Sequence, residues 1–598
     1  MRLLPRTWLL LLLLPMLTAC MPSQRQVLRA RHMVSSNIEH GVSCQRRDHC
    51  AADSGLYALA AQGKGNRNQA VILDLGEDAL IARLNLIRAA RQSISIQTYI
   101  WANDDAGKLM LDALVAAARR GVHVRILADQ LASFNDLEQL ATLARTHVNF
   151  ELRLYNPTLQ SAETGAFGYF VGGLCCFSNL NQRMHNKLFL VDGHIGITGG
   201  RNYENRYFDW DSDFNFLDRD ILVAGPVAQD MRASFFLFWN HPRAVKLTLL
   251  RDVSAQLIRD GPDAPGWQPP RYERADRVQR VLEEAADPAY IKSHFLLRAK
   301  SLKDVEYFAD RPGKTDNPSK RERELTAHLM NLVSTASQEI ILQTPYLVIS
   351  DRGQRIFRKL QKERSRVRIL ISTNSLASTD AFAVYAVAHK YVRRYLAVFN
   401  FNIYEQKPHP VDAPRMIAHY NELSGSGARV GNRGRYSAVP LTTSGVRVSL
   451  HAKSMVVDKQ YVMIGSHNFD PRSDDYNTEC GIIIHDRDFA RVVRASILAT
   501  IRPGNSWVVA KRQVNGMVGR INRALAKLSA ALPIFDLWPF GYATSYQLKP
   551  GCPVMRREDP RFYACYEPVG EFPEVALPLK TIYTRIITGF GAGMSDML

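Results

Sequence analysis

The hydrophobic and polar positions of the chain follow helix and strand periods in turn. Apolar residues recur every three or four positions over 77–92, which predicts a helix. The β-branched and aromatic residues of 93–101 predict a strand. A second helix over 106–121 and a second strand over 122–130 follow. This alternation predicts an α/β protein in which helices cover a sheet.

The second half of the chain repeats this order of elements. Helices are predicted over 322–337 and 352–363, and strands over 338–348 and 366–374. Short sequence matches accompany the repeat: Ile96-Gln97-Thr98 matches Leu342-Gln343-Thr344, Val124-Arg125-Ile126-Leu127 matches Val367-Arg368-Ile369-Leu370, and 149–157 matches 400–408. The sequence therefore predicts a duplicated α/β unit.

With 598 residues, the chain is long enough for two sizeable cores. We place the two domains at 69–255 and 321–535, joined by a linker over 256–320 in which clustered Pro and Gly interrupt regular structure. Residues 536–598 are rich in Pro, Gly and aromatic side chains and have no counterpart in the first half, so they are expected to be a C-terminal extension.

The stretch "HNKLFLVD" combines a hydrophobic strand pattern with two basic side chains. His185 and Lys187 lie two positions apart, so in a strand they share one face. Asp192-Gly193 is a favoured two-residue hairpin turn, and pairing about it would bring Gly200 opposite His185. Taken alone, the stretch is more typical of an edge strand with two solvated side chains than of a reactive site.

A second copy of this hairpin strengthens the signal. Its offsets are kept in the second half: His451, Lys453, Asp458, Gly465 and Asn468 repeat His185, Lys187, Asp192, Gly199 and Asn202. Chance seldom repeats five specified residues at the same spacing. The two aspartates lie at the turns, and we interpret them as mainly structural.

The paired motifs carry the groups that phosphodiester chemistry needs. Such a reaction requires a nucleophile on one side of the phosphorus and an acid for the leaving oxygen on the other, and two histidines can supply both. Lysine and asparagine side chains would hold the non-bridging oxygens; the candidates are Lys187, Asn202, Lys453 and Asn468.

Each histidine also needs an acceptor that orients its second ring nitrogen. Glu479, 28 residues after His451, is the candidate partner of that histidine. Asp218 is the candidate partner of His185, with Asp220 as the alternative.

The doubled His-x-Lys-x4-Asp motifs, in "MHNKLFLVDGHIGITGGRN" and "LHAKSMVVDKQYVMIGSHNFDPRS", resemble those of the phospholipase D superfamily, above all its bacterial cardiolipin synthase branch. The resemblance covers about residues 65–535. It implies two pseudo-symmetric α/β/α domains with the active site at their interface, and a two-step reaction without metal or cofactor. The implied catalytic residues are His185, Lys187, Asp192, His451, Lys453 and Asp458, with His185 as nucleophile and His451 as general acid. Gly200 stands where many relatives have Ser, as Ser466 does in the second motif, and the resemblance implies Ser466 as a further phosphate-binding residue.

The resemblance implies that a phosphatidyl group passes through a phosphatidyl-histidine to phosphatidylglycerol, giving cardiolipin. The donor is a second phospholipid, for which phosphatidylethanolamine is one candidate. The alternatives are hydrolysis of phospholipids by a phospholipase D-type enzyme, a nuclease, and a non-enzymatic lipid-binding scaffold. Two complete motifs argue against the scaffold.

Net charge adds information about partners. A formal charge of +19 favours anionic partners, either nucleic acid or an anionic membrane surface, although a generally basic surface alone would also produce it. No segment after the N-terminus is long and apolar enough to span a bilayer.

The N-terminus predicts export. Residues 1–19 have two arginines and then a short apolar run, as in a signal peptide. Leu17-Thr18-Ala19-Cys20 resembles a bacterial lipoprotein box, which implies lipidation of Cys20 and a tether over 20–68. The alternatives are a plain cleaved signal and an uncleaved anchor. The expected location is the cell envelope, facing the periplasm, where phospholipid is plentiful and no nucleic acid partner is expected. Met21, in place of Asp, favours the outer membrane.

The remaining cysteines and one apolar segment allow further expectations. Two pairs bracket short loops and could form disulfides in an oxidising compartment: Cys44 with Cys50, and Cys552 with Cys565. No set of His and Cys has zinc spacing. Inert packing is expected for Cys175, Cys176 and Cys480. The apolar segment 164–177 either borders a lipid entrance or is a buried helix or loop.

Overall fold

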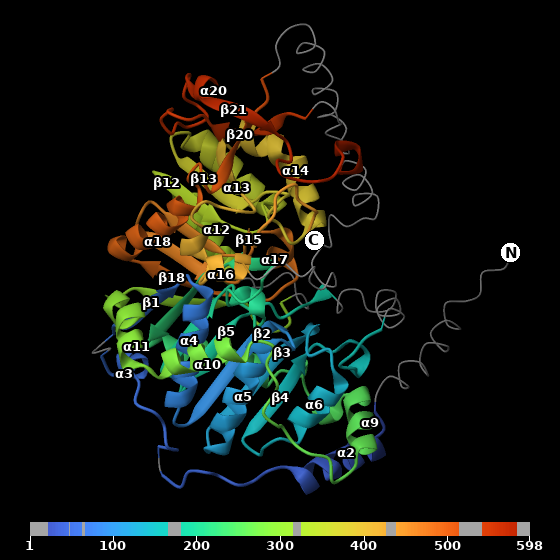
Figure 1. The fold of residues 1–598 in the computed structure, drawn as a ribbon. Coiled ribbons are helices and arrows are strands. Elements are labelled where there is room, and N and C mark those ends of the chain that lie inside the picture. The colour runs from blue at the N-terminus through green and yellow to red at the C-terminus, as the bar shows by residue number, and fades with distance from the viewer. Residues whose placement is uncertain are drawn as a thin grey trace, which may run out of the picture.

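In a computed structural model, the chain forms two large sheets, one in each half, with helices over their outer faces (Figure 1). The structure describes residues 22–46, 48–62, 66–165, 181–314, 324–425, 438–513 and 541–582. The first nineteen residues and Cys20 lie outside these ranges, as do Cys175, Cys176 and nearly all of the apolar segment 164–177.

The first sheet has nine strands in the order β10-β1-β8-β6-β5-β2-β3-β4-β9. Their bounds are β1 (Asn68–Leu73), β2 (Ser93–Trp101), β3 (His123–Ser133), β4 (Phe150–Tyr155), β5 (Leu188–Val191), β6 (Ile195–Gly199), β8 (Asp220–Ala224), β9 (Ala244–Lys246) and β10 (Lys300–Leu302). β2, β3 and β4 are parallel, and β2 pairs with β5 in antiparallel fashion.

The second sheet has ten strands in the order β11-β18-β17-β16-β12-β13-β14-β19-β20-β21. Their bounds are β11 (Val305–Ala309), β12 (Glu339–Gln343), β13 (Arg368–Asn374), β14 (Phe401–Gln406), β16 (Ser454–Val457), β17 (Tyr461–Gly465), β18 (Cys480–His485), β19 (Ser506–Lys511), β20 (Ala543–Leu548) and β21 (Tyr566–Gly570). Seven consecutive strands, β18 to β19, repeat the order β8 to β9 of the first sheet, which confirms the predicted α/β duplication.

Helices complete the two layers. The first half contains α2 (Gln24–Asn37), α3 (Gly55–Gln62), α4 (Gly76–Ala89), α5 (Asp105–Arg119), α6 (Leu137–Ala144), α8 (Val227–Trp239), α9 (Arg251–Asp260), α10 (Ala275–Ala286) and α11 (Pro288–His294). The second half contains α12 (Glu324–Thr335), α13 (Asp351–Glu363), α14 (Phe382–Ala397), α15 (Ala413–Met416), α16 (Tyr420–Gly425), α17 (Pro471–Asp475), α18 (Arg487–Thr500) and α20 (Phe562–Cys565). None of the helices in the described ranges has the length and apolar character needed to cross a bilayer.

The structure moves the expected domain boundaries. β10 and β11 fall in the expected linker, but β10 is the edge strand of the first sheet, and β11 pairs with β18 as β1 pairs with β8. The second domain therefore starts before residue 321. Sequence reasoning missed β11 because its length of five residues gives too little periodicity.

Two segments expected to stand apart from the domains are packed onto them. In the expected tether 20–68, α2 packs against α9 and α3 packs against α4. In the expected C-terminal extension, β20 and β21 continue the second sheet beyond β19. The structure contains the disulfides Cys44–Cys50 and Cys552–Cys565, each closing one of the predicted loops.

The two halves share one hydrophobic core. Leu188 and Val223 of the first sheet lie in the same buried cluster as Val456 and Ile482 of the second, together with side chains of α8 and α18. A parallel pair of short strands, β7 (Phe214–Leu217) and β15 (Arg447–Leu450), also joins the halves. The relative position of the two motifs is therefore set by buried contacts.

The turn of each motif hairpin differs from the predicted two-residue turn. Val191 pairs with Ile195 and Val457 with Tyr461, so three residues form each turn and the register shifts by one position. Gly200 is therefore not opposite His185. Asp192 and Gly193 both have positive φ, and this backbone conformation lets the turn contain a third residue, His194.

Candidate active site

Two short strand contacts between the halves position the motif histidines. Met184 forms a parallel bridge with Thr478, and Leu450 pairs in parallel with Leu217. The backbone N–H of His185 donates to the carbonyl of Thr478 (3.0 Å), and that of His451 donates to the carbonyl of Leu217 (2.8 Å). The backbone of each histidine is therefore bound to the residue just before an acid of the other half: Thr478 precedes Glu479, and Leu217 precedes Asp218.

This arrangement crosses the acid–histidine pairs between the halves. Nδ1 of His185 lies 2.8 Å and 3.0 Å from the two carboxylate oxygens of Glu479. Nδ1 of His451 lies 2.6 Å from Oδ2 of Asp218. The sequence-based pairing of Glu479 with His451 and of Asp218 with His185 is thus wrong. Proximity along the chain suggested it, but the strand contacts bring each acid to the opposite histidine.

The two acids occupy equivalent places in the duplicated fold. Gly199 pairs with Asp220 and Gly465 pairs with Gly481, and each acid lies two residues before that partner. The alternative acid, Asp220, instead forms a buried ion pair with Arg83 (2.7 Å).

Gly200 of the first motif and Ser466 of the second both lie against an acid of their own half, Asp218 and Glu479 respectively. A Cβ atom at Gly200 would overlap with Oδ1 of Asp218, so a serine would clash there. In the second half, the hydroxyl of Ser466 donates to Glu479 (2.5 Å) and accepts from the backbone N–H of Cys480 (3.0 Å). Because a hydroxyl has a single proton, Ser466 positions Glu479, and the expectation that it binds phosphate is corrected.

Ser473 is a site residue that sequence reasoning missed. Its hydroxyl donates to Oε1 of Glu479 (2.8 Å), so this buried carboxylate accepts from two serines and one histidine. The residue is on α17, and its spacing from the motif follows no period that a sequence pattern could reveal.

The lysines are buried beside their histidines. Nζ of Lys187 donates to the carbonyl of His185 (2.9 Å), and Nζ of Lys453 donates to the carbonyl of His451 (2.5 Å). Burial lowers the pKa of Lys187 to about 7 and that of Lys453 to about 8. Two ammonium groups in one buried space favour an anionic ligand.

Electrostatics keep the two imidazoles neutral and the two acids charged. Burial lowers the pKa of His185 to about 4 and that of His451 to about 3, and both lysines act in the same direction. Burial by itself would raise the pKa of the acids, but each acid's electrostatic interaction and hydrogen bond with its histidine, together with the nearby lysine charge, hold the pKa of Asp218 well below its usual range and lower that of Glu479 to about 2. Since a carboxylate only accepts, Nδ1 is the protonated nitrogen and Nε2 carries the lone pair.

Polar and aromatic groups complete the site. Oδ1 of Asn202 accepts from the backbone N–H of Ile100 (3.1 Å). The amide nitrogen of Asn202 is therefore the atom that would donate to a phosphate oxygen. Asn468 is 8 % exposed, and its Oδ1 has no hydrogen-bond partner among the described residues. The hydroxyl of Tyr207 lies 3.5 Å from Nε2 of His451, and the ring of Tyr99 meets His185 edge-on. Sequence patterns did not single out either tyrosine.

The motif aspartates lie at the turn ends of the hairpins, away from the histidines. Asp192 accepts from the backbone N–H groups of Arg91, Gln92 and Ser93, and from the hydroxyl of Tyr57. Asp458 accepts from the backbone N–H groups of Ser337, Gln338 and Glu339, and from the hydroxyl of Ser337. These bonds agree with the structural role expected for both.

Within the described ranges, no three His, Cys, Asp or Glu side chains group in a way that could hold a metal ion. Cys480 is buried, outside any disulfide, with its sulfur 3.5 Å from the hydroxyl of Thr198, as expected for packing.

Comparison with known proteins identifies the family of the chain. The family model described as "Cardiolipin synthase, PLD-like domain" matches twice, over residues 84–239 and 329–499. The chain belongs to the phospholipase D superfamily, in its cardiolipin synthase-like branch. The two matched segments each contain one complete motif and the acid that orients the histidine of the other.

Relatives match over most of their length. The chain is 31% identical to cardiolipin synthase C of Escherichia coli K12 over 70% of this chain and 82% of the relative. It is also 31% identical to an uncharacterized protein of Helicobacter pylori 26695, over 74% of this chain and 81% of the relative. Among solved structures, phosphatidylserine synthase of Haemophilus influenzae Rd KW20 aligns with 14% identity and a TM-score of 0.47, over 80% of this chain and 98% of that one.

Proposed function

We propose that the protein is a phosphatidyltransferase that makes cardiolipin from phosphatidylglycerol and a second phospholipid through a phosphatidyl-histidine. The crossed pairs His185–Glu479 and His451–Asp218 carry this proposal, because they provide two oriented, buried imidazoles. Two lysine side chains, Lys187 and Lys453, lie near both imidazoles. The named similarity to a cardiolipin synthase supports the choice of lipid substrates.

In the first step, Nε2 of His185 attacks the phosphorus of the donor lipid. The bond from phosphorus to the headgroup oxygen breaks, and the imidazolium of His451 gives its Nε2 proton to that oxygen. The products are a phosphatidyl-histidine and the free headgroup alcohol. The Lys187 and Lys453 ammonium groups would offset the charge that develops on the non-bridging oxygens.

In the second step, neutral His451 removes the proton of a hydroxyl of phosphatidylglycerol. The resulting oxygen attacks phosphorus, the bond between phosphorus and Nε2 of His185 breaks, and cardiolipin leaves. Glu479 keeps the proton of His185 on Nδ1 throughout, so Nε2 can form and release the bond.

Substrate itself supplies the protonation state that the first step needs. With both imidazoles neutral, the site has a nucleophile but no acid. A bound phosphodiester adds a negative charge beside His451, and an adjacent negative charge raises the pKa of an imidazole. We infer that His451 takes up its proton as the donor lipid binds.

We also propose that the protein works as a lipoprotein of the bacterial cell envelope, facing the periplasm and anchored through Cys20, with the outer membrane favoured. The lipoprotein box and the formal charge of +19 support this location. A single covalently attached chain gives marginal membrane binding, so attraction between a basic protein and anionic lipid would add to it.

Products identified by mass spectrometry test the reaction. Purified protein incubated with vesicles of phosphatidylglycerol should yield cardiolipin and glycerol. With phosphatidylethanolamine as the donor, the released alcohol should be ethanolamine. Phosphatidic acid without cardiolipin would identify the enzyme as a phospholipase D and refute transfer. Turnover should persist in EDTA, because the proposed steps draw their charges from lysines and histidines.

A further inference from the structure

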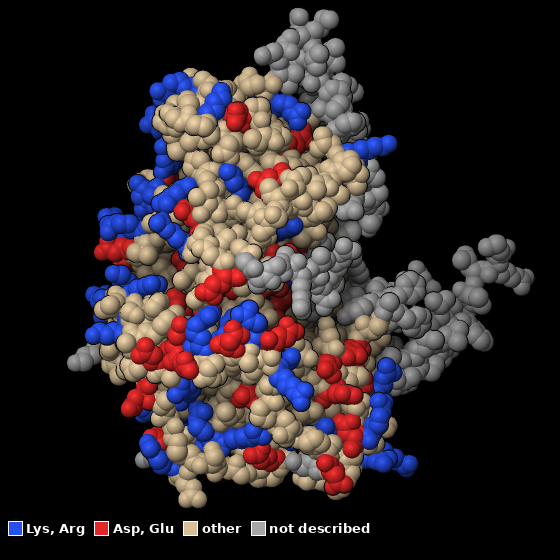
Figure 2. All heavy atoms as spheres, viewed as in Figure 1, with Lys and Arg blue, Asp and Glu red and all other residues tan. Residues whose placement is uncertain are grey.

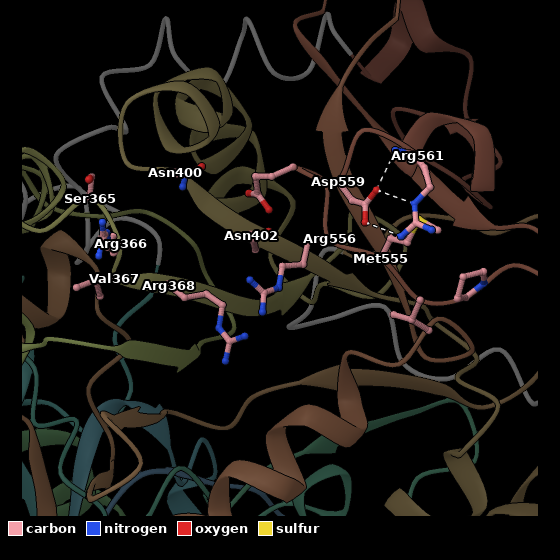
Figure 3. A pocket seen from close by; sticks show the side chains of 13 residues that line it. Ser365, Arg366, Val367, Arg368, Asn400, Asn402, Met555, Arg556, Asp559 and Arg561 are labelled. Carbon is pink, nitrogen blue, oxygen red and sulfur yellow. Dashed lines mark hydrogen bonds and ion pairs between the residues drawn. The ribbon is translucent and has the colours of Figure 1, made fainter.

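A pocket of about 590 Å³ lies between the second sheet and the loop closed by the Cys552–Cys565 disulfide (Figure 3). One wall comes from the residues that lead into β13 and β14, and the other from residues 553–561. The pocket therefore exists only because the C-terminal extension packs on the second domain.

The pocket is remote from the catalytic groups. β13 runs from Arg368, which lines the pocket, to Asn374, whose amide donates to the carbonyl of Leu450 (2.7 Å) next to His451. Six residues of strand span about 20 Å. A ligand in this pocket would thus be a different molecule from the one that reacts.

Positive charge is in excess in the pocket. Of the four arginines that line it, Arg561 is paired with Asp559, and Arg368 shares the carboxylate of Glu339 with Arg494. The second acid of the lining, Glu558, is paired with Arg557.

Arg366 and Arg556 carry the unbalanced charge. Both are exposed, and neither forms an ion pair within the described part of the chain. Figure 3 shows Arg556 and Arg368 extending into the same space, and burial together with the charges of Arg556 and Arg494 lowers the pKa of Arg368. Guanidinium groups that outnumber the carboxylates beside them are typical of phosphate sites.

A buried amide adds a second reason to expect a ligand. Asn402, which lines the pocket, is 5 % exposed, and its Oδ1 has no partner among the described residues. A buried polar atom normally has a hydrogen-bond partner, and a hydroxyl of a bound headgroup would provide one.

The rim of the pocket favours a lipid over a free anion. Val554, which is 68 % exposed, and Pro553 lie beside Arg556 in the lining. An apolar side chain exposed next to an arginine suits the boundary between headgroups and acyl chains. The surrounding surface is also basic: Figure 2 shows lysine and arginine side chains gathered along one edge of the second half, and α13, which ends just before the pocket, exposes Arg355, Arg358 and Lys362.

We propose that this pocket binds the phosphate and hydroxylated headgroup of an anionic glycerophospholipid, which holds the C-terminal extension against the membrane surface during turnover. This inference does not depend on the reaction at the histidines. Binding to vesicles, rather than catalysis, therefore tests it.

Sedimentation of the purified full-length protein with vesicles measures the binding. The probes are vesicles of phosphatidylcholine alone and of equal parts of phosphatidylcholine and phosphatidylglycerol. The test variant carries Arg366→Ala and Arg556→Ala, and the matched control carries Arg271→Ala and Lys292→Ala, two exposed basic residues of the first half. Circular dichroism spectra should be unchanged, since all four side chains are exposed.

The test variant should bind the anionic vesicles about 30-fold more weakly than the wild type, because each basic residue at an anionic surface contributes on the order of a fivefold increase in partitioning. The control should lose less than about threefold. Equal losses of vesicle binding in the two variants would mean that only the net charge of the protein matters, and would overturn the proposal that the pocket binds lipid.

Val554→Ser separates a lipid from a free phosphate. This variant should weaken vesicle binding and leave calorimetric titration with inorganic phosphate unchanged. If phosphate binds the wild type but not the arginine variant, while vesicle binding is insensitive to both Val554→Ser and the arginine substitutions, the pocket is a site for a soluble anion and the lipid proposal fails.

Discussion

The crossed acid–histidine pairs predict that each acid affects the histidine of the other half, and not the histidine that is nearer in the sequence. Glu479 belongs to the half that contains His451, yet it orients His185. We therefore expect Glu479→Gln to reproduce the defect of His185→Ala, and Asp218→Asn to reproduce that of His451→Ala. Both changes keep the size of the side chain, remove its charge and replace one acceptor oxygen by an NH2 donor.

The magnitude follows from the hydrogen bonds. A hydrogen bond to a charged group contributes about 1.5–3 kcal/mol, and its loss in the transition state lowers kcat/KM by about 10- to 150-fold. The amide that Glu479→Gln introduces would also present an N–H to Nδ1 of His185, which forces the proton onto Nε2 and removes the nucleophilic lone pair. Asp218→Asn has the corresponding consequence for His451: Nε2 holds a proton and cannot act as a base.

A donor lipid with a good leaving group distinguishes the two variants, because its first step needs no acid. Asp218→Asn should then accumulate phosphatidyl-enzyme, and mass spectrometry should locate the label on the peptide that contains His185. Glu479→Gln should form little or none. Glu306→Gln, at an exposed position of the neighbouring strand β11, is the matched control and should behave as wild type.

One result would refute the crossed orientation, and another would reverse the roles of the two histidines. If Glu479→Gln accumulates the intermediate and Asp218→Asn does not, with the label still on His185, the crossed orientation does not govern the chemistry. If the label lies on the peptide around His451 and the two variants exchange behaviour, the crossed pairs hold but the roles of the histidines are reversed. Thermal melts of both variants must show a folded protein, since Glu479 also accepts hydrogen bonds from two serines.

The hairpin aspartates, the buried lysines and histidines, and Cys20 each give a further prediction. Asp192→Ala and Asp458→Ala should each lower the free energy of unfolding by about 2–6 kcal/mol in guanidinium titrations, because each carboxylate accepts four hydrogen bonds at about 0.5–1.5 kcal/mol apiece; an unchanged midpoint would contradict the structural role. Inhibition by glycerophosphoglycerol, a phosphodiester of constant charge, should weaken as pH rises from about 7 to about 9, since the pKa of Lys187 is lowered to about 7 and that of Lys453 to about 8 and deprotonation removes their charge. The lowered histidine pKa values, about 4 and about 3, mean that the unfolded state binds more protons below pH ~6.5, so the free energy of unfolding should fall as pH falls from about 6.5 to about 3. Radioactive fatty acid fed to cells should label the wild type and not Cys20→Ala, and membrane fractionation should recover the labelled protein in the cell envelope; equal labelling of both would exclude lipidation at Cys20.

Local pattern determined the repeated units of this protein. The helical period of 77–92 and the strand composition of 93–101 correspond to α4 and β2, because the apolar positions of both are buried in one core. The doubled motif identified the two histidines and two lysines because five specified residues recur at the same spacing in the two halves. These features depend on neighbours in sequence, so the sequence alone contains them.

The tertiary structure decided which groups meet. Short edge elements such as β11 and β21 have too few residues to show a period, and the place of β11 in the sheet depends on a partner strand that is distant in the chain. The pairing of Glu479 with His185 depends on the bridge between Met184 and Thr478, a contact between halves that no spacing encodes. Each acid orients the histidine of the other half because the two halves pack through a shared core. The geometry of that packing is a property of the folded molecule.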